Sequence, residues 1–538
     1  MNQAAPEILS EIGRRKTFAI ISHPDAGKTT VTEKLLLFGN AIHMAGVVKA
    51  KRAGHFATSD WMEIEKQRGI SVTSSVMQFT YADHEINLLD TPGHQDFSED
   101  TYRVLTAVDS ALMIIDSSKG IETQTKKLFQ VCRDRRLPIL TFMNKMDLEG
   151  RDPFELIDEV EKVLKLPCRP MTWPIGQGKR FKGVYDLAEK KIRIFQPGMK
   201  SLGFEQQVFT SLEDPALREK IGSESHDKLK DDLELLQAGH DFDKEQYLQG
   251  GLSPVFFGSA VNNFGLQELL EAFIKYAPSP RPRPAETREV EPGEAHFTGL
   301  IFKIQANMDP KHRDRVAFLR ICSGEFQQGM SVHHVRQGKN FKINNALQFM
   351  SQRRTNVDHA YAGDIIGVHD RGNLMIGDTL TQGEDLNFTG VPLFSPELFC
   401  RVELKNPIKS KQLQKGLEQL AEEGMSQIFR KKHNSETIIG VVGQLQFEVV
   451  KFRLLNEYGA DANFIPLGYS FSRWLHSTDR KAMDDFLGYY QNHIVYDVRG
   501  YPLILFKSEW EKDYIEGKSP KLSFYSSLIT YVQARGHD

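Results

Sequence analysis

Short apolar runs alternate with amphipathic segments through the first half of the chain. The apolar runs predict buried strands, and segments with apolar residues at helical spacing predict helices. Strands are predicted at Thr17–Ile21, Ser74–Tyr81, Glu85–Leu89, Ala111–Ile115, Pro138–Met143 and Pro254–Ala260, and helices at 31–38, 122–135 and 266–276. This alternation predicts a doubly wound, mostly parallel α/β sheet, in which ligands bind at the carboxyl ends of the strands.

The pattern changes twice farther along the chain. Between residues 168 and 249, two short strands lead into a charged helical segment, which we interpret as an insertion with a solvated helix face. Pro278–Pro284 has proline at every second position, which predicts a semi-extended linker. Beyond it, alternating apolar and polar residues predict short strands to about residue 380. No helical pattern interrupts them, which favours a small β-barrel.

The last part of the chain mixes both patterns and shows no internal repeat. A strand at Phe399–Lys405 precedes a helix at 411–423, two short strands and a helix at 444–455, an order that favours a ferredoxin-like α/β domain. Beyond residue 474 the pattern predicts one helix, at 480–490, and no topology. The predicted fold is therefore multidomain α/β. Its domains are a doubly wound domain at 1–280 with an insertion at about 168–249, a β-barrel at 281–390, and an α/β domain with a C-terminal tail at 391–538.

The composition is that of a globular protein. The chain has 538 residues, 40% hydrophobic and 26% charged, which is enough for roughly three or four domains. A net charge of −3 provides no overall attraction to nucleic acid or to an anionic membrane, so RNA contacts would need local basic patches. The four cysteines form no C-x-x-C pair. With neither a signal peptide nor a run near the ~18 apolar residues of a membrane span, we expect a cytoplasmic protein.

The first predicted strand leads into a loop that ends in Gly27-Lys28-Thr29, where a helix begins. Strand, tight turn and helix in this order are typical of a phosphate-binding loop, although Ser22 occupies the place of the motif's first glycine. Backbone N–H groups at the helix start would point at phosphate oxygens, Lys28 would supply a cation, and the Thr29 hydroxyl would bind Mg²⁺. Taken alone, the motif also fits a surface turn.

Two further strand ends carry chemistry that suits a guanine nucleotide. Asp90 ends a buried strand, which is the usual position of the Mg²⁺-side carboxylate in phosphate-loop enzymes. Another strand leads into Asn144-Lys145-Met146-Asp147, where Asp147 could accept both hydrogens on the N1 and N2 edge of guanine. Asn144 would bond the other edge of the base, and the Lys145 stem would cover the ring. Taken alone, Asn-Lys-x-Asp is also typical of a charged turn.

The motifs agree in position because each follows a strand end. Ser259-Ala260, after the next strand, would offer backbone N–H to guanine O6. Together the motifs predict a P-loop GTPase domain that binds GTP, GDP and Mg²⁺. The candidate nucleotide-binding residues are Ser22, His23, Pro24, Asp25, Ala26, Gly27, Lys28, Thr29, Thr30, Asp90, Thr91, Pro92, Gly93, Asn144, Lys145, Asp147, Ser259 and Ala260.

These motifs together resemble the translational GTPases, the class that includes elongation factor G. The matching segments are Ser22–Thr30, Arg68–Ser71, Asp90–His94 and Asn144–Asp147. The resemblance implies that Arg68–Ser71 is the first switch, in which Ser71 replaces a threonine that binds Mg²⁺ and senses the γ-phosphate. It makes His94 the catalytic residue that orients the attacking water, with the Gly93 N–H on the γ-phosphate. The Mg²⁺ ligands would be Thr29, Ser71 and Asp90; a helix-start or core histidine is the alternative for His94.

The similarity extends to one branch of this class, the class II release factors. It is carried by Ser22–Asp25, Ser59–Glu63, Gln67–Ser71, Phe142–Lys145, Thr172–Gly176 and Phe302–Phe318, and weakens beyond about residue 447. It implies a ribosome-dependent GTPase that ejects and recycles class I release factors after peptide release. The implied partners are the ribosome, with its RNA and proteins, and the class I factors, without DNA or a membrane; we expect a monomer when free. A chain ending at Asp538 would lack the extra C-terminal domains of elongation factor G.

Contacts to RNA are less defined by the sequence. The basic clusters are Lys311-His312-Arg313 with Arg315, Arg353-Arg354, Lys405 with Lys409 and Lys411, and Arg430-Lys431-Lys432-His433. Each also fits a solvated charged face, and the nearby Phe318 and Phe429 are expected in the core. The alternatives for function are another ribosomal GTPase (translocase-like or a ribosome-protection factor) and a metabolic GTPase subunit.

Overall fold

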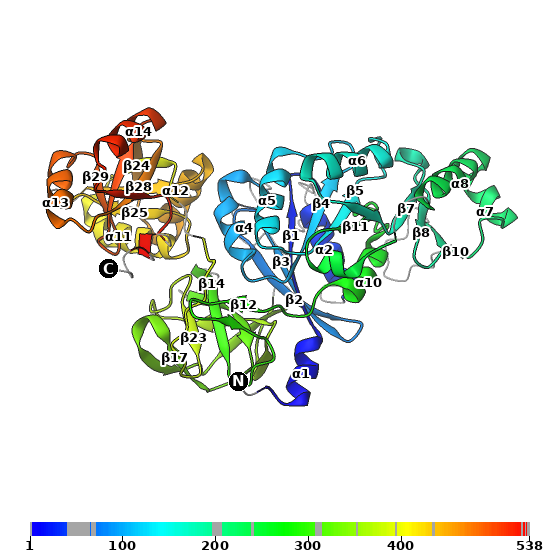
Figure 1. Ribbon diagram of the computed structural model, residues 1–538, viewed down its shortest axis with the longest axis horizontal. Coiled ribbons are helices and arrows are strands. Elements are labelled where there is room, and N and C mark those ends of the chain that lie inside the picture. The colour runs from blue at the N-terminus through cyan, green and yellow to red at the C-terminus, as the bar shows by residue number, and fades with distance from the viewer. Residues whose placement is uncertain are drawn as a thin grey trace.

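The computed structural model has three domains and a separate small sheet that extends from the first domain (Figure 1). It describes residues 3–39, 65, 71–195, 207–237, 241–306, 315–350, 353–392, 395–432, 436–528, 531–532 and 534. Residues 68–70 of the expected first switch (Arg68–Ser71) and the basic cluster at 311–313 lie outside these residues. Within them, no helix combines the length and the apolar character needed to cross a membrane.

The first domain is built on a seven-stranded sheet in the order β2-β3-β1-β4-β5-β11-β6. Every pair is parallel except β2 with β3. The strands are β1 (Arg15–Ser22), β2 (Ser75–Tyr81), β3 (His84–Asp90), β4 (Ser110–Asp116), β5 (Ile139–Asn144), β6 (Cys168–Pro170) and β11 (Ser253–Phe257). All residues of β1, β4 and β5 are buried, as expected for strands covered on both faces.

Helices cover both faces of this sheet, which confirms the doubly wound arrangement. Phe18 and Ile20 of β1 pack on one face against α2 and α10, whereas Ala19 and Ile21 pack on the other face against α5 and α6. The helices are α2 (Lys28–Phe38), α4 (Ser98–Val104), α5 (Thr123–Asp134), α6 (Pro153–Leu164), α9 (Lys244–Leu248) and α10 (Leu266–Tyr276), with a 3-10 turn η1 at Gln95–Phe97.

The small second sheet lies at the far right of Figure 1, beyond the edge of the first domain. Its antiparallel order is β10-β9-β8-β7, and helices α7 and α8 accompany it. The elements are β7 (Thr172–Ile175), η2 (Gly178–Arg180), β8 (Gly183–Asp186), β9 (Lys191–Ile194), β10 (Gln207–Phe209), α7 (Pro215–Ile221) and α8 (Ser223–Gln237). Because β6 pairs with β11 in the main sheet, the separate sheet begins at Thr172, slightly later than the expected residue 168.

The predicted linker is anchored to the first domain rather than free. Arg283, in this segment, donates to the carbonyls of Thr106 at 2.7 Å and Val108 at 2.8 Å and pairs with Asp109 at 2.9 Å. The N-terminal helix α1 (Pro6–Gly13) reaches the second domain, because Ile12 belongs to that domain's core. Contacts at both ends of the first domain therefore hold the second domain in place.

The second domain is a curled antiparallel β domain, as the predicted β-barrel required. Its main sheet has the order β18-β17-β23-β14-β15-β22-β19-β20, and the pairs β16-β21 and β12-β13 lie beside it. The strands are β12 (Arg283–Pro284), β13 (Glu289–Val290), β14 (Thr298–Ala306), β15 (Arg315–Ser323), β16 (Glu325–Gln327), β17 (Ser331–His334), β18 (Lys339–Lys342), β19 (Ala346–Met350), β20 (Arg353–Asn356), β21 (His359–Tyr361), β22 (Ile365–His369) and β23 (Thr379–Thr381), with η3 at Val335–Gln337.

The third domain repeats one topology twice, which the sequence did not reveal. Its eight-stranded sheet has the order β27-β24-β26-β25-β29-β30-β28-β31, so two βαββαβ units of ferredoxin-like order join through β25 and β29. The first unit comprises β24 (Leu398–Leu404), η4 (Pro407–Lys409), α11 (Ser410–Glu422), β25 (Gln427–Arg430), β26 (Thr437–Val441), α12 (Gln444–Tyr458) and β27 (Ala462–Pro466). The second comprises β28 (Phe471–His476), α13 (Arg480–Tyr489), β29 (Ile494–Asp497), β30 (Pro502–Phe506), α14 (Glu509–Lys518) and β31 (Ser523–Tyr525).

Candidate nucleotide-binding site

The expected phosphate loop connects β1 to the start of α2. Gly27 lies directly before α2 with a φ of 96°, and Asp25 also has a positive φ of 64°. A Cβ atom on Gly27 would lie 2.3 Å from Asn144 Nδ2, so a side chain there would collide as well as strain the backbone. The turn and the close packing against the Asn-Lys-x-Asp segment therefore require glycine at position 27.

Lys28 and Asp90 form a buried ion pair at the base of this loop. The other carboxylate oxygen of Asp90, Oδ2, is buried without a hydrogen-bond partner in the described part of the chain. Thr91, the next residue, donates its hydroxyl to the Ile20 carbonyl at 2.6 Å and fixes the end of β3 against β1. A buried oxygen without a donor beside a lysine is suited to a cation, so the residues present fit Mg²⁺ and a phosphate group.

Asn144 connects the phosphate loop to the loop after β11. Its Nδ2 donates to the Ala26 carbonyl at 2.8 Å, and its Oδ1 accepts the Ala260 N–H at 2.9 Å. In the structure this side chain holds two loops together, and the expected bond from Asn144 to the base stays a prediction. Asn144 is 118 residues from Ala26 and 116 residues from Ala260 in the sequence, so both contacts depend on the sheet order.

Lys145 is held by two acceptors at the same end of the sheet. Its Nζ donates to the Asp25 carbonyl at 2.6 Å and to Asp116 Oδ2 at 2.7 Å. Burial raises the pKa of Asp116, but hydrogen bonds from Lys145 and Ser118 outweigh it and leave the pKa below its usual value. Asp116 therefore stays charged and fixes the lysine whose stem we expected beside the base.

The Ser259 and Ala260 backbone groups differ from the expectation. We predicted that their N–H groups would be offered to guanine O6. The Ala260 N–H donates to Asn144 instead, and the Ser259 N–H donates to the Phe264 carbonyl at 2.9 Å. Both residues are buried, and both amides already have partners inside the protein.

His94 lies at the start of η1, with its side chain about one-third exposed. Its Nδ1 accepts the Asp96 N–H at 3.2 Å, so the neutral ring carries its proton on Nε2. The ring also makes an edge contact with Phe97, at 6.1 Å between centroids. His94 thus has the helix-start position of the alternative interpretation and keeps a ring nitrogen for a further partner, so the geometry is compatible with both roles.

The remaining candidate residues lie on the same loops. Gly93 approaches Pro24, because a Cβ on Gly93 would lie 3.4 Å from the Pro24 Cα. Ser71 is half-buried next to Val72, whose N–H donates to the buried Glu65 carboxylate at 2.8 Å. The role of Ser71 as a Mg²⁺ ligand stays a prediction. By exposure the others are Ser22, Ala26, Thr91 and Pro92 buried, His23, Thr29, Thr30 and Asp147 half-buried, and Asp25 exposed.

The resemblance to translational GTPases makes the Pro92-Gly93-His94 turn the second switch, a name we use for this turn together with η1 and α4 after it. Sequence reasoning missed the contacts that attach this segment to the other domains. Asp100 of α4 accepts from Ser74, and Lys303 of β14 donates to the Ser74 hydroxyl at 2.9 Å and approaches Asp100 at 3.4 Å. Burial lowers the pKa of Lys303, while Asp100 counteracts that effect. One buried lysine of the second domain thus contacts both the segment after the first switch and the second-switch helix.

Helix α4 also contacts the third domain. Arg103 donates to the Gly424 carbonyl at 2.9 Å and pairs with Glu99 at 3.2 Å. Asp96 accepts the N–H of Leu445, near the start of α12, at 2.7 Å. The only signal in the sequence was the density of charged residues directly after His94, which a solvated helix would also show.

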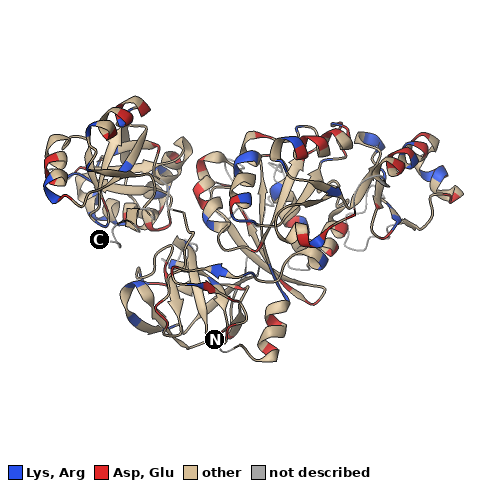
Figure 2. Ribbon diagram, in the orientation of Figure 1, with Lys and Arg blue, Asp and Glu red and all other residues tan. Residues whose placement is uncertain are grey.

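Several residues of the basic clusters proposed for RNA form ion pairs within the protein. Arg315 is buried and pairs with Asp370 and Glu422, so it is a structural residue and is removed from the candidates. Several exposed lysines and arginines also have acidic partners: Lys405 with Asp461, Arg430 with Glu418, and Lys431 with Glu436. In Figure 2 basic and acidic residues alternate along the helices. Phe318 and Phe429 are buried, which confirms their place in the core.

Comparison with known families assigns three consecutive parts of the chain. Residues 14–279 match the elongation factor Tu GTP binding domain, and residues 296–383 match elongation factor G domain 2. Residues 388–516 match the class II release factor RF3, C-terminal domain. The first match indicates a GTPase domain that binds guanine nucleotides, and it contains every candidate nucleotide-binding residue.

Solved structures support the same architecture. The crystal structure of a protein from Thermus thermophilus superposes with a TM-score of 0.69 and 24% identity, covering 87% of this chain and 71% of that chain. At this identity the likeness is one of fold. A GTP-binding domain, an elongation-factor second domain and a release-factor C-terminal domain follow one another in this order, and the chain therefore belongs to the class II release factor RF3 family of translational GTPases.

Proposed function

We propose that this chain is a ribosome-dependent GTPase of translation termination that promotes dissociation and recycling of class I release factors after peptide release. The observation that carries the proposal is the combination of a GTP-binding domain with a class II release factor C-terminal domain in one chain. The other ribosomal GTPases and the metabolic GTPase subunits considered above do not account for that C-terminal match. We place the domains at 1–280, 281–390 and 391–538, with the protein cytoplasmic and monomeric when free.

The nucleotide would bind across the carboxyl ends of β1, β3, β5 and β11, where the candidate residues meet. Lys28 and the N–H groups at the start of α2 would hold the β- and γ-phosphates. Asp147 would accept from the guanine N1 and N2 groups, and Lys145, held by Asp25 and Asp116, would cover the ring. Asn144 would act indirectly by keeping the phosphate loop and the base loop in register.

Thr29, Asp90 and Ser71 would hold Mg²⁺, which neutralises charge on the phosphate oxygens. The described residues contain no cluster of three or more His, Cys, Asp or Glu side chains arranged for a metal. That finding suits Mg²⁺, since it usually takes only one or two protein carboxylates and completes its coordination with phosphates and water. The unpartnered Asp90 Oδ2 is the oxygen we assign to it.

Hydrolysis would transfer the γ-phosphoryl group to water and leave GDP. His94 is the residue we assign to orient that water, because the Asp96 N–H engages Nδ1 and leaves Nε2 to contact the water. The ribosome would complete this arrangement. Loss of the γ-phosphate would then alter the second switch, and α4 would pass the change to the second domain through Lys303 and to the third domain through Arg103.

The decisive experiment follows a fluorescently labelled class I release factor on post-termination ribosomes. The protein and GTP are added together, separately, or with a non-hydrolysable GTP analogue. Faster departure of the class I factor only with both protein and nucleotide supports the recycling role. Ribosome-stimulated hydrolysis without faster departure would leave another ribosomal GTPase role, and no effect on either would favour the metabolic alternative.

A further inference from the structure

Helices α13 and α14 of the third domain expose a group of aromatic side chains, which we call the aromatic strip. It consists of Trp510 and Tyr514 on α14 with Tyr489 and Tyr490 at the end of α13. Tyr489 is 82% exposed, Trp510 73% and Tyr514 47%. The Trp510 and Tyr514 rings stack at 5.4 Å with an interplanar angle of 12°, and the Tyr489 and Tyr490 rings lie 4.7 Å apart.

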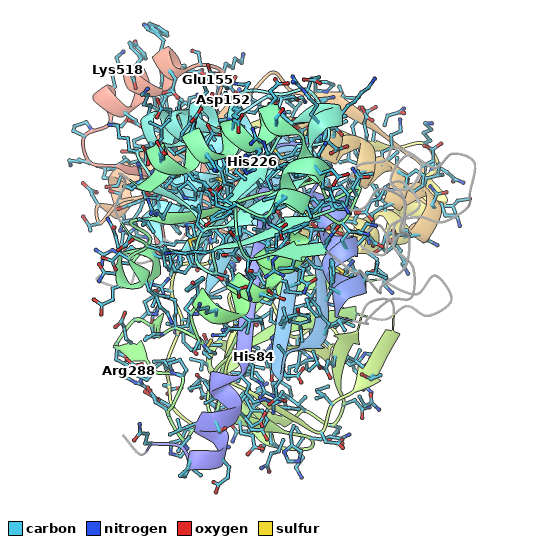
Figure 3. All side chains as sticks on the ribbon, turned by 90° about the vertical axis from the view of Figure 1, so that its right-hand side faces the viewer. His84, Asp152, Glu155, His226, Arg288 and Lys518 are labelled. Carbon is cyan, nitrogen blue, oxygen red and sulfur yellow. The ribbon has the colours of Figure 1, made fainter. Side chains whose placement is uncertain are left out.

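Apart from Tyr490, which packs against Phe486 at the border of the core, the aromatic strip lies outside the core of its own domain. Trp510, Tyr514 and Lys518 are spaced by four residues and share one face of α14, while Ile515 is buried on the opposite face. That core already contains Phe486, Ile494, Ile504 and Phe506. Figure 3 shows Lys518 on α14 at the outer edge of the molecule. Grouped exposed rings of this size mark interaction surfaces in soluble proteins.

Exposed aromatic rings commonly bind either RNA or a protein, and the charge of the surrounding residues distinguishes the two. Along α14 the charged residues are Glu509, Glu511, Lys512, Asp513, Glu516 and Lys518, so carboxylates outnumber lysines by four to two. Lys512 pairs with Asp513 at 3.3 Å, and the Lys518 Nζ lies 4.2 Å from the centre of the Tyr514 ring. The surplus of carboxylates along α14 would repel an RNA backbone.

We propose that the aromatic strip is a docking surface for a protein partner that presents arginine or lysine side chains. Guanidinium or ammonium groups would stack on Trp510 and Tyr489, as Lys518 already does on Tyr514. The carboxylates of Glu509, Asp513 and Glu516 would border those cations. The inference rests on the proposed function in one respect: the partner would be a component of the termination complex.

Three replacements of Trp510 separate a protein partner from RNA. We measure the affinity of each variant for purified post-termination ribosomes that carry a class I factor, with a non-hydrolysable GTP analogue present. Trp510→Ala should weaken binding roughly tenfold, and Trp510→Phe, which keeps a stacking ring, should recover most of it. Trp510→Lys should bind more weakly than Trp510→Ala, because a cation repels a cationic partner. Tighter binding by Trp510→Lys would assign the surface to RNA and overturn the proposal.

A cross-link identifies the partner directly. A benzophenone side chain is placed at position 510 and irradiated in the same purified complex. An adduct with a protein at an arginine- or lysine-rich segment supports the proposal. An adduct with ribosomal RNA alone, or no adduct in a complex that forms with wild-type affinity, overturns it. If the wild type neither binds ribosomes nor hydrolyses GTP faster with them, the proposed function fails first, and this docking role fails with it.

Discussion

The Asp96 carboxylate accepts the backbone N–H of Leu445, with 2.7 Å between Oδ2 and N. Asp96 also donates its own N–H to the His94 ring at 3.2 Å. Leu445 is the second residue of α12 in the third domain. A single residue of the second switch therefore contacts both the proposed catalytic histidine and a helix of the release-factor domain, and its carboxylate satisfies a free N–H at that helix start.

Replacing Asp96 with alanine should loosen the third domain where α12 meets the second switch. The change removes a capping acceptor, which is worth about 0.5–2 kcal/mol, while the backbone bond to His94 remains. Hydrogen exchange at the Leu445 amide should accelerate by roughly twofold to thirtyfold. Binding of fluorescent GDP should stay within about twofold of the wild type. Asp134→Ala, which removes an exposed carboxylate from α5, is the matched control; equal exchange rates in the two variants would contradict the assigned role.

Gly27→Ala should weaken nucleotide binding strongly. The alanine would have to adopt a φ of 96°. Its Cβ would lie 2.3 Å from Asn144 Nδ2 and would disturb the bond from Asn144 to Ala26. We expect a loss of at least tenfold in affinity for fluorescent GDP, equivalent to about 1.4 kcal/mol. Gly222→Ala is the control, because Gly222 has a φ of 82° and open space around it. Comparable losses in the two variants would assign the effect to general backbone strain.

Most of the first domain was predictable because its strands are short, buried and apolar. The predicted strands at 17–21 and 111–115 lie within β1 and β4, and the one at 138–143 overlaps β5 in all but its first residue; the motifs were found at their ends as expected. Phosphate-loop chemistry needs particular residue types at fixed local spacing, so one sequence is enough to suggest it. The RF3 resemblance, carried by motif residues between Ser22 and Phe318, is confirmed by the family matches.

Contacts between distant segments could not be predicted. Asn144 bonds Ala260, and Asp96 bonds Leu445 at a separation of 349 residues; both depend on which loops the fold brings together. The second βαββαβ unit was missed for another reason. Its last strand, β31, has only 3 residues, and in α14 the apolar stripe is replaced by the exposed Trp510 and Tyr514. Helical periodicity identifies the buried face of a helix, whereas the aromatic residues of α14 lie on its exposed face.

Glu99 should make stability depend on pH. Burial raises its pKa from 4.5 to about 7, against the opposing effect of Arg103, while Asp100 and Glu397 reinforce the increase. Between pH 5 and 7 the folded protein thus holds a proton that the unfolded chain releases. The free energy of unfolding therefore falls as pH rises through this interval. Glu99→Gln removes that titration, so the variant should gain stability relative to wild type by on the order of 1–3 kcal/mol between pH 5 and 7.5.

Urea unfolding of wild type and Glu99→Gln at several pH values measures this difference. Glu219→Gln, an exposed change on α7, controls for the loss of a negative charge. A difference between Glu99→Gln and wild type that stays constant with pH would show that Glu99 is ionised in the folded protein throughout the interval.

His94→Ala should leave GTP binding intact and slow ribosome-stimulated hydrolysis by about a hundredfold or more, because the water-orienting group is lost. Single-turnover hydrolysis on ribosomes and a fluorescent GDP titration measure the two effects separately. His84→Ala is the matched control, since this histidine is the half-buried first residue of β3 and its Nδ1 contacts the Ala82 carbonyl. Hydrolysis at the wild-type rate in His94→Ala would remove His94 from its assigned role and favour a helix-start function.

Asp147→Asn should relax the preference for guanine. An amide replaces one acceptor oxygen with a donor, which leaves the guanine amino group without a partner and suits the 2-oxo group of xanthine. We expect GDP affinity to fall roughly tenfold to a hundredfold and xanthosine diphosphate affinity to rise. Asp152→Asn is the control, because Asp152 caps α6 nearby and asparagine is an equally good cap. If Asp147→Asn still discriminates like the wild type, the base contact belongs to another residue on the loops after β5 and β11.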